Sequence, residues 1–255
     1  MNTFLSKLLA TSCFILSFSS FGFTDEIDKL NRVLNNFSTE SPIHVELHSS
    51  FNHVFDGNKK SGAVKLKLAV DKEGFHATYD QPTLTAMASE SAAKTQNEDH
   101  ESPTINAASK LNTVDMYRML SASKSIQQFL YNATFINATF VMEEGKSYQQ
   151  LRFNIPMESL VKNKKTRQYV DEFESEYVLW LNDTDIPVKS HLSFQGNGSA
   201  YVIFDLEAHG ETTITYQVVN NRLIEVEHIS KNGNSSIFGD FERVKTQRLT
   251  VLPTP

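Results

Sequence analysis

The sequence has little cysteine, little tryptophan and no excess of basic charge. Its only cysteine, Cys13, lies near the N-terminus, so a chain from which that segment is removed has no disulfide. Lys plus Arg total 24 against 30 Asp plus Glu, and the resulting net charge of -6 excludes the strongly basic surface typical of nucleic-acid-binding proteins. With 40% hydrophobic and 21% charged residues, the 255-residue chain has the composition of a globular protein.

Catalytic signatures are lacking as well. The sequence has no G-x-S-x-G, Walker A, G-x-G-x-x-G or H-E-x-x-H motif, and its S-x-x-K tetrapeptides at Ser91, Ser121 and Ser159 lack the S-D-N and K-T-G partners of β-lactamases. His44 and His48 share one face of an expected strand, but four strand residues span roughly 13 Å, which is too far for two ligands of one metal ion. We therefore predict a protein that is not an enzyme and requires no cofactor.

Residues 1–22 have the features of a secretory signal peptide. Lys7 precedes an apolar stretch over residues 8–18, and Ser20-Phe21-Gly22 provides small residues around a cleavage site. The apolar stretch is shorter than the roughly 20 residues that a membrane span requires, so we expect cleavage rather than anchoring. An exported domain without disulfides favours the periplasm of a Gram-negative bacterium. Residues 10–13 also loosely resemble a lipobox, which leaves lipidation of Cys13 as an alternative.

The periodicity of the apolar residues changes from helical to strand-like near Pro42. Before it, Asp25 is positioned to cap a helix with apolar residues every three or four positions. After it, Ile43, Val45 and Leu47 alternate with polar residues, and similar runs recur between turn signals as far as Leu249. This pattern predicts ten or eleven antiparallel strands in a meander.

Residues 104–131 interrupt the strands with a helical pattern that includes Met116, Met119 and Phe129. An apolar helix face needs a partner surface, so we expect these helices to cover the sheet together with the N-terminal helix. No linker or fixed repeat divides the chain. We predict a single domain over residues 23–255, of the α+β class and mainly β.

A sheet of about eleven strands with one apolar face is expected to curl, because strand twist accumulates. The curled sheet is expected to enclose a concave apolar surface and to present polar side chains on its outer face. We predict that inward side chains and two methionines of the helical lid line a hydrophobic cavity: Leu66, Leu68, Phe75, Phe140, Phe153, Tyr177, Phe194, Phe204, Met116 and Met119. The same residues are compatible with a solid core, since strand number alone permits both arrangements.

Two further features concern the outer surface. The only basic run contains Lys162, Lys164, Lys165 and Arg167, and it is either a solvated loop or a docking patch for anionic head groups or an acidic protein partner. Trp180 shares a strand face with Glu174 and Glu176, so we expect it to point away from the cavity.

This order of elements resembles the LolA/LolB-type periplasmic lipoprotein carriers. The resemblance includes the stretch Leu179-Trp180-Leu181-Asn182, a turn, and then Pro187-Val188-Lys189-Ser190-His191-Leu192-Ser193-Phe194. It implies an unclosed barrel that shelters acyl chains beneath helices, and no individual residue role is transferred from it. We therefore predict a periplasmic carrier or binding protein for a lipid, an acyl chain or a lipid-anchored cargo. The alternative is an envelope interaction or scaffold protein with a packed interior.

Overall fold

The computed structural model describes residues 22–161, 163–200, 204–236 and 239–253. These residues form ten strands and seven helices. In chain order the elements are α1 (Gly22–Asn35), β1 (Ile43–Phe55), β2 (Asn58–Asp71), β3 (Gly74–Thr78), α2 (Gln81–Gln96), α3 (Pro103–Ala108), α4 (Thr113–Met119), α5 (Ala122–Leu130), β4 (Thr134–Glu143), β5 (Lys146–Asn154), α6 (Met157–Leu160), α7 (Lys164–Arg167), β6 (Glu172–Leu181), β7 (Pro187–Ala200), β8 (Phe204–Val219), β9 (Arg222–Ser236) and β10 (Gly239–Val251).

All ten strands belong to one antiparallel sheet in the order β3-β2-β1-β10-β9-β8-β7-β6-β5-β4. The edge strands β3 and β4 do not pair with each other, so the sheet does not close into a barrel. The predicted fold class, an open antiparallel sheet with a few helices, is confirmed. The strand number is ten, at the lower end of the expected range.

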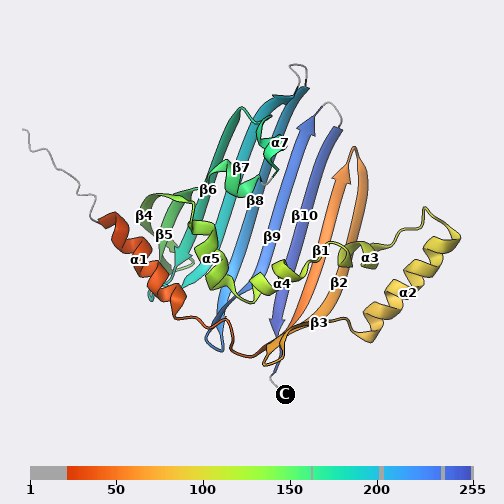
Figure 1. Cartoon of the computed structure of the whole chain (residues 1–255), viewed down its shortest axis with the longest axis horizontal. Helices are drawn as coiled ribbons and strands as arrows, with labels where there is room; N and C mark the ends of the chain where they lie inside the picture. Colours follow the sequence, from red (N-terminus) through yellow and green to blue (C-terminus); the bar gives the residue numbers. More distant parts are fainter. Residues whose placement is uncertain (1–21, 162, 201–203, 237–238, 254–255) are drawn as a thin grey trace, which may run out of the picture.

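The chain crosses the face of the sheet once, between its two edges. After β3 the segment that holds α2, α3, α4 and α5 leads to β4 at the opposite edge, and Figure 1 shows α4 and α5 lying across the sheet in front of its central strands. Helix α1 lies beside the β4 and β5 side and packs against α5. The helices expected near residues 104–131 therefore cover the inner face of the sheet.

Three apolar clusters hold the helices on the sheet, and the smallest joins Ala107 of α3 to Phe51 and Val64. The first surrounds Leu151, Phe153 and Tyr177, where Leu34 of α1 and Ile126 of α5 are fully buried. The second is built on β1, β2 and β10 and includes the α4 methionines. Each side chain that leaves water contributes about 25 cal/mol per Å² of buried apolar area. The region between the first two clusters remains available for a cavity.

Arg222 ties the helical cover to the start of β9. Its side chain is completely buried, and Nη1 donates to the carbonyl oxygen of Leu120 at 2.6 Å, just after α4. Nε donates to the Ser41 carbonyl at 2.5 Å, and Nη2 donates to the Thr39 carbonyl, so the same guanidinium holds the segment between α1 and β1. Burial lowers the pKa of Arg222 from its ordinary value.

Helix α3 reaches the sheet through a close backbone approach. The carbonyl oxygen of Pro103 lies so near Gly62 of β2 that a Cβ atom at this glycine would overlap it. The carboxylate of Glu90 in α2 accepts hydrogen bonds from the backbone N–H groups of Thr104 and Ile105, both at 2.9 Å. Burial alone would raise the pKa of Glu90, but these hydrogen bonds hold it below its ordinary value.

Part of the sequence lies outside the described residues. The predicted signal peptide covers residues 1–22 and includes Cys13. Only Gly22, the first residue of α1, belongs to the described residues. Within the described ranges, no helix combines the length and apolarity needed to span a membrane.

Candidate functional site

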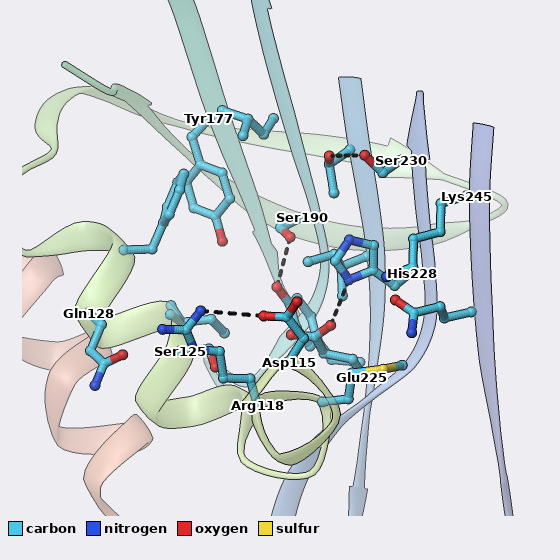
Figure 2. Close-up of a pocket in the computed structure, with 18 of the residues that line it drawn as sticks. Asp115, Arg118, Ser125, Gln128, Tyr177, Ser190, Glu225, His228, Ser230 and Lys245 are labelled. Carbon is cyan, nitrogen blue, oxygen red and sulfur yellow. Dashed lines mark hydrogen bonds and ion pairs between the residues drawn. The ribbon is translucent and has the colours of Figure 1, made fainter. Parts of the chain in front are cut away.

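A cavity of about 630 Å³ lies between the helical cover and the inner face of the sheet. Helices α4, α5 and α6 supply its cover, and strands β6 to β10 form its floor. Figure 2 shows the labelled polar side chains of both layers facing this space. Ligand-binding pockets in proteins commonly measure about 300–1,000 Å³, so the cavity has the size of a small-molecule site.

Strand register explains which side chains reach the floor, because cross-strand partners share a face. One row of partners runs across five strands and contains Tyr177, Leu192, Thr212, Ser230 and Lys245. The next row contains Ser190, Ile214, His228 and Gln247. All of these residues line the cavity.

Three buried hydroxyl groups meet at one side of the floor. Ser190 Oγ lies 2.8 Å from the hydroxyl of Tyr216, and both groups favour ionisation of the Tyr177 hydroxyl against the larger opposing effect of its burial. Burial raises the pKa of Tyr177 to about 12 and that of Tyr216 well above its ordinary value. Both phenols therefore remain neutral hydrogen-bonding groups at physiological pH.

A β-bulge places a carboxylate and an imidazole together in the cavity. On β9, Glu225 is paired with Tyr216 and Glu227 with Thr215, so Val226 is the extra residue. Bulges of this kind redirect side chains, and here both Glu225 and His228 line the cavity. His228 Nδ1 is 2.9 Å from Glu225 Oε2, and the Glu225 side chain is only 7% exposed.

Some polar groups at the cavity have no hydrogen-bond partner in the described part of the chain. Ser125 Oγ on the cover and Gln247 Nε2 on the floor are buried and unpartnered. Buried polar atoms are normally satisfied, so these two are available to a bound molecule. Burial also lowers the pKa of Lys245, against a smaller opposing effect of Asp115.

The apolar part of the lining comes mainly from the cover and from β7 and β8: Met119, Ile126, Phe129, Leu192 and Ile214. The lining is more polar than the hydrophobic cavity that strand alternation predicts. Strand alternation placed apolar residues inward, but Glu225, His228, Lys245 and Gln247 also face the cavity. The site can therefore contact a molecule that has both an apolar and a polar part.

Of the ten predicted lining residues, Tyr177 and Met119 line this cavity. The apolar clusters contain five others, either buried or packed against them: Leu66, Leu68, Met116, Phe75 and Phe153. Phe194 lines a second, more open hollow of about 510 Å³ at one end of the sheet. The side chain of Phe204 lies outside what the structure describes.

The expected position of Phe140 in the lining is corrected. Its register partner is Gln149, which shares a strand face with the buried Leu151, so Phe140 does lie on the inner face of edge strand β4. Phe140 is nevertheless not among the residues that line the cavity, and its side chain is 78% exposed.

The predicted docking run lies on and beside the short helix α7. Lys164 and Lys165 are exposed, whereas Nη1 of Arg167 donates to the Val161 carbonyl oxygen at 2.7 Å. Lys162 is outside the described residues. None of the described members of this run lines the main cavity.

Trp180 is held by neighbouring side chains. Its Nε1 donates to Glu143 Oε1 at 2.8 Å, and Lys189 Nζ lies 4.6 Å from the ring centroid. Among the described residues, no group of three or more His, Cys, Asp or Glu side chains is arranged to hold a metal ion, and His44 and His48 belong to no such group.

The chain thus folds as an open antiparallel sheet with a cavity beneath its helices. No model of a known protein family matches the chain, and no curated protein matches it. Among solved structures, a DUF1329 family protein from Desulfovibrio piger is 9% identical, with a TM-score of 0.31, and the match covers 89% of this chain and 92% of that one.

A second solved structure, MucB in complex with MucA(peri), is 8% identical with a TM-score of 0.20, and the match covers 89% of this chain and 93% of that one. At these values the likeness is coarse. It assigns neither a family nor a function to this chain.

Proposed function

We propose that this protein is a non-enzymatic binding protein that holds the apolar part of an amphiphile, such as a lipid, an acyl chain or an acylated cargo, in the cavity between α4, α5 and the sheet. The observation that carries the proposal is the cavity of about 630 Å³ between two packed apolar clusters. An envelope location, in the periplasm of a Gram-negative bacterium, is part of the same proposal and is supported by the signal-like sequence of residues 1–22.

The lining supports an amphiphile more than a wholly polar ligand. Ile126 and Phe129 on the cover lie opposite Leu192 and Ile214 on the floor. An acyl chain between these two layers would be removed from water on both of its sides. Burial of each methylene contributes about 0.8 kcal/mol, which corresponds to about fourfold in affinity. The unpartnered Ser125 hydroxyl and Gln247 amide are available for the polar part.

The test measures binding of saturated monoacyl ligands of increasing chain length by displacement of a fluorescent acyl probe. Affinity should rise by about fourfold per methylene and then level off when the cavity is full. Native mass spectrometry of gently purified protein should show a co-purifying lipid. Affinity that is independent of chain length, together with no bound lipid, would contradict the proposal.

Cavity-filling variants localise the binding. Ile214→Trp and, from the cover, Ser125→Phe each add bulk to the cavity lining and should weaken binding at least about tenfold. Val218→Trp is the control on the same strand as Ile214, because Val218 is 41% exposed and does not line the cavity. Circular dichroism checks that each variant is folded.

A second candidate function is an interaction protein that uses the edge of its sheet. Strand β4 has a free edge and carries the exposed side chains Ile136, Phe140 and Met142. Exposed apolar edge strands readily pair with another chain. Crosslinking at β4 to one specific envelope protein, combined with no lipid binding, would favour this candidate.

A further inference from the structure

A row of basic side chains crosses the inner face beside the cavity. In the strand register, His53 of β1 is opposite Lys60 of β2 on one side and Arg243 of β10 on the other. Lys245 follows two residues after Arg243 on the same face, so it also lies near this row. Lys60 and Arg243 therefore flank the same imidazole ring, and their two positive charges oppose protonation of His53.

A fifth basic side chain adds to this group, which we call the inner basic patch: Lys60, His53, Arg243, Lys245 and Lys110. Lys110 follows α3, and its Nζ lies 4.8 Å from the ring centroid of Phe51, the cross-strand partner of Lys245. Arg243 lies 5.2 Å from the ring of Phe241, which also contacts His53. The patch therefore combines cations with aromatic faces.

The patch lacks acidic partners. In the described part of the chain, none of its lysines or its arginine forms an ion pair, whereas Lys65, Lys231 and Arg248 elsewhere on the sheet each pair with a glutamate. Burial lowers the pKa of Lys245, and Asp115 opposes this shift without forming an ion pair with the lysine. Uncompensated positive charge on a protein with a net charge of -6 points to an anion from outside the chain.

His53 contributes to the patch a ring nitrogen that has no hydrogen-bond partner among the described residues. This atom, Nε2, is buried. Burial, followed by the charges of Arg243, Lys110 and Lys60, lowers the pKa of His53. A bound anion would accept a hydrogen bond from this ring and reduce the repulsion among its neighbours.

Lys245 connects the patch with the cavity. Its side chain lines the cavity, and its own cross-strand neighbour Phe51 belongs to the patch side of the sheet. Adjacent strands lie about 4.8 Å apart, so Lys60, His53 and Arg243 together span roughly 10 Å, the width of a small head group. Figure 1 shows that the β1–β2 hairpin, where Lys60 and His53 lie, extends beyond the helices that cross the sheet.

We propose that the inner basic patch binds the phosphate-type anionic head group of the amphiphile whose apolar part occupies the cavity. This inference rests on the proposed function and adds to it the charge class of the ligand. The planar guanidinium of Arg243 suits two oxygens of one phosphate, and the lysines supply further positive charge.

The test compares two probes with the same acyl chain, lysophosphatidate and neutral monoacylglycerol, below their critical micelle concentrations. Wild-type protein should bind the phosphate probe about tenfold more tightly at low salt, and the ratio should approach one as salt rises. Arg243→Gln with Lys60→Gln should remove this preference and leave affinity for the neutral probe unchanged. Lys231→Gln with Arg248→Gln makes the same change in net charge outside the patch and should preserve the preference.

The outcomes separate the two proposals. If both probes bind equally, or if the double variant keeps the preference, the head-group proposal is overturned while the proposed function stands. If neither probe binds, both are overturned. Inorganic phosphate that binds as tightly as lysophosphatidate indicates a free-anion site and also overturns the head-group proposal. Nuclear magnetic resonance provides a local readout, because lysophosphatidate alone should raise the pKa of His53.

Discussion

Glu225 and His228 are three residues apart on β9, yet both side chains enter the same cavity and lie 2.9 Å apart. Regular strand alternation would place them on opposite faces, so their contact depends on the bulge at Val226. The hydrogen bond satisfies a carboxylate that is almost completely buried. The pair is therefore a structural determinant of the polar end of the cavity.

Removal of this carboxylate should destabilise the protein. Glu225→Ala leaves His228 Nδ1 without its partner, and we expect a loss of about 1–3 kcal/mol in the free energy of unfolding, measured with urea. Glu225→Gln retains an oxygen acceptor and should lose less. Glu227→Gln is the neighbouring control, which should change stability by less than about 0.5 kcal/mol. Equal losses in the Gln and Ala variants would show that the hydrogen bond is not responsible.

Arg222 should be among the most sensitive positions for stability. Arg222→Met leaves the carbonyl oxygens of Thr39, Ser41 and Leu120 without a donor, and we expect a loss on the order of 3 kcal/mol. Arg222→Lys keeps the charge but lacks the planar fork that reaches all three oxygens, so its loss should be intermediate. Arg248→Met removes a more exposed arginine as the control. Urea unfolding measures all three, and a neutral Arg222→Met would contradict this role.

The buried phenols predict a specific alkaline response. The pKa of Tyr177 is raised from 10.0 to about 12, so its contribution to stability is complete below pH 10 and is lost as the pH rises through about 12. The unfolding free energy of Tyr177→Phe should therefore fall less steeply across this range than that of the wild type. Tyr131→Phe, at a position 87% exposed, is the control and should keep the wild-type slope. Titration of Tyr177 near pH 10 would refute the prediction.

The contact between β2 and α3 should be sensitive to a single methyl group. A Cβ at Gly62 would overlap the Pro103 carbonyl oxygen and approach the Phe51 ring to 2.8 Å. Gly62→Ala should lose about 1–3 kcal/mol and should speed hydrogen exchange in α3. At Gly196 of β7 the nearest contact of a Cβ would be 3.5 Å, so Gly196→Ala is the matched control and should be near neutral. Unchanged exchange in α3 of Gly62→Ala would show that the contact is not tight.

Much of the fold was predictable because alternation and turn residues determine antiparallel strands locally. The runs around Val45 and Leu66 predicted buried faces that the structure confirms, and the spacing of Leu30 and Leu34 predicted the buried stripe of α1. The pairing of β1 with β10 was not predictable in this way, since local patterns do not specify which distant strands become neighbours.

The cavity was less predictable than the sheet. The alternation of Ile224 and Val226 predicts that Glu225 points outward, and the bulge that reverses this has no glycine to mark it. Arg243, Lys245 and Gln247 lie on the inner face of β10. Polar residues on a strand do not indicate which face they occupy unless apolar residues alternate with them. Phe140 was placed on the correct face, but its exposure depends on where the helical cover ends.

The junction of β1 with β10 also determines when the sheet can form. Val45 pairs with Val251, so the hairpin of β1 and β2 joins the other strands only after the chain has been synthesised as far as β10. Contacts between such distant residues slow folding because a very long loop must close first. A nascent chain that ends before Gly239 would therefore contain two unjoined parts of the sheet, β3-β2-β1 and β9 to β4. Each part would have an additional unpaired edge strand, which is prone to pair with other chains.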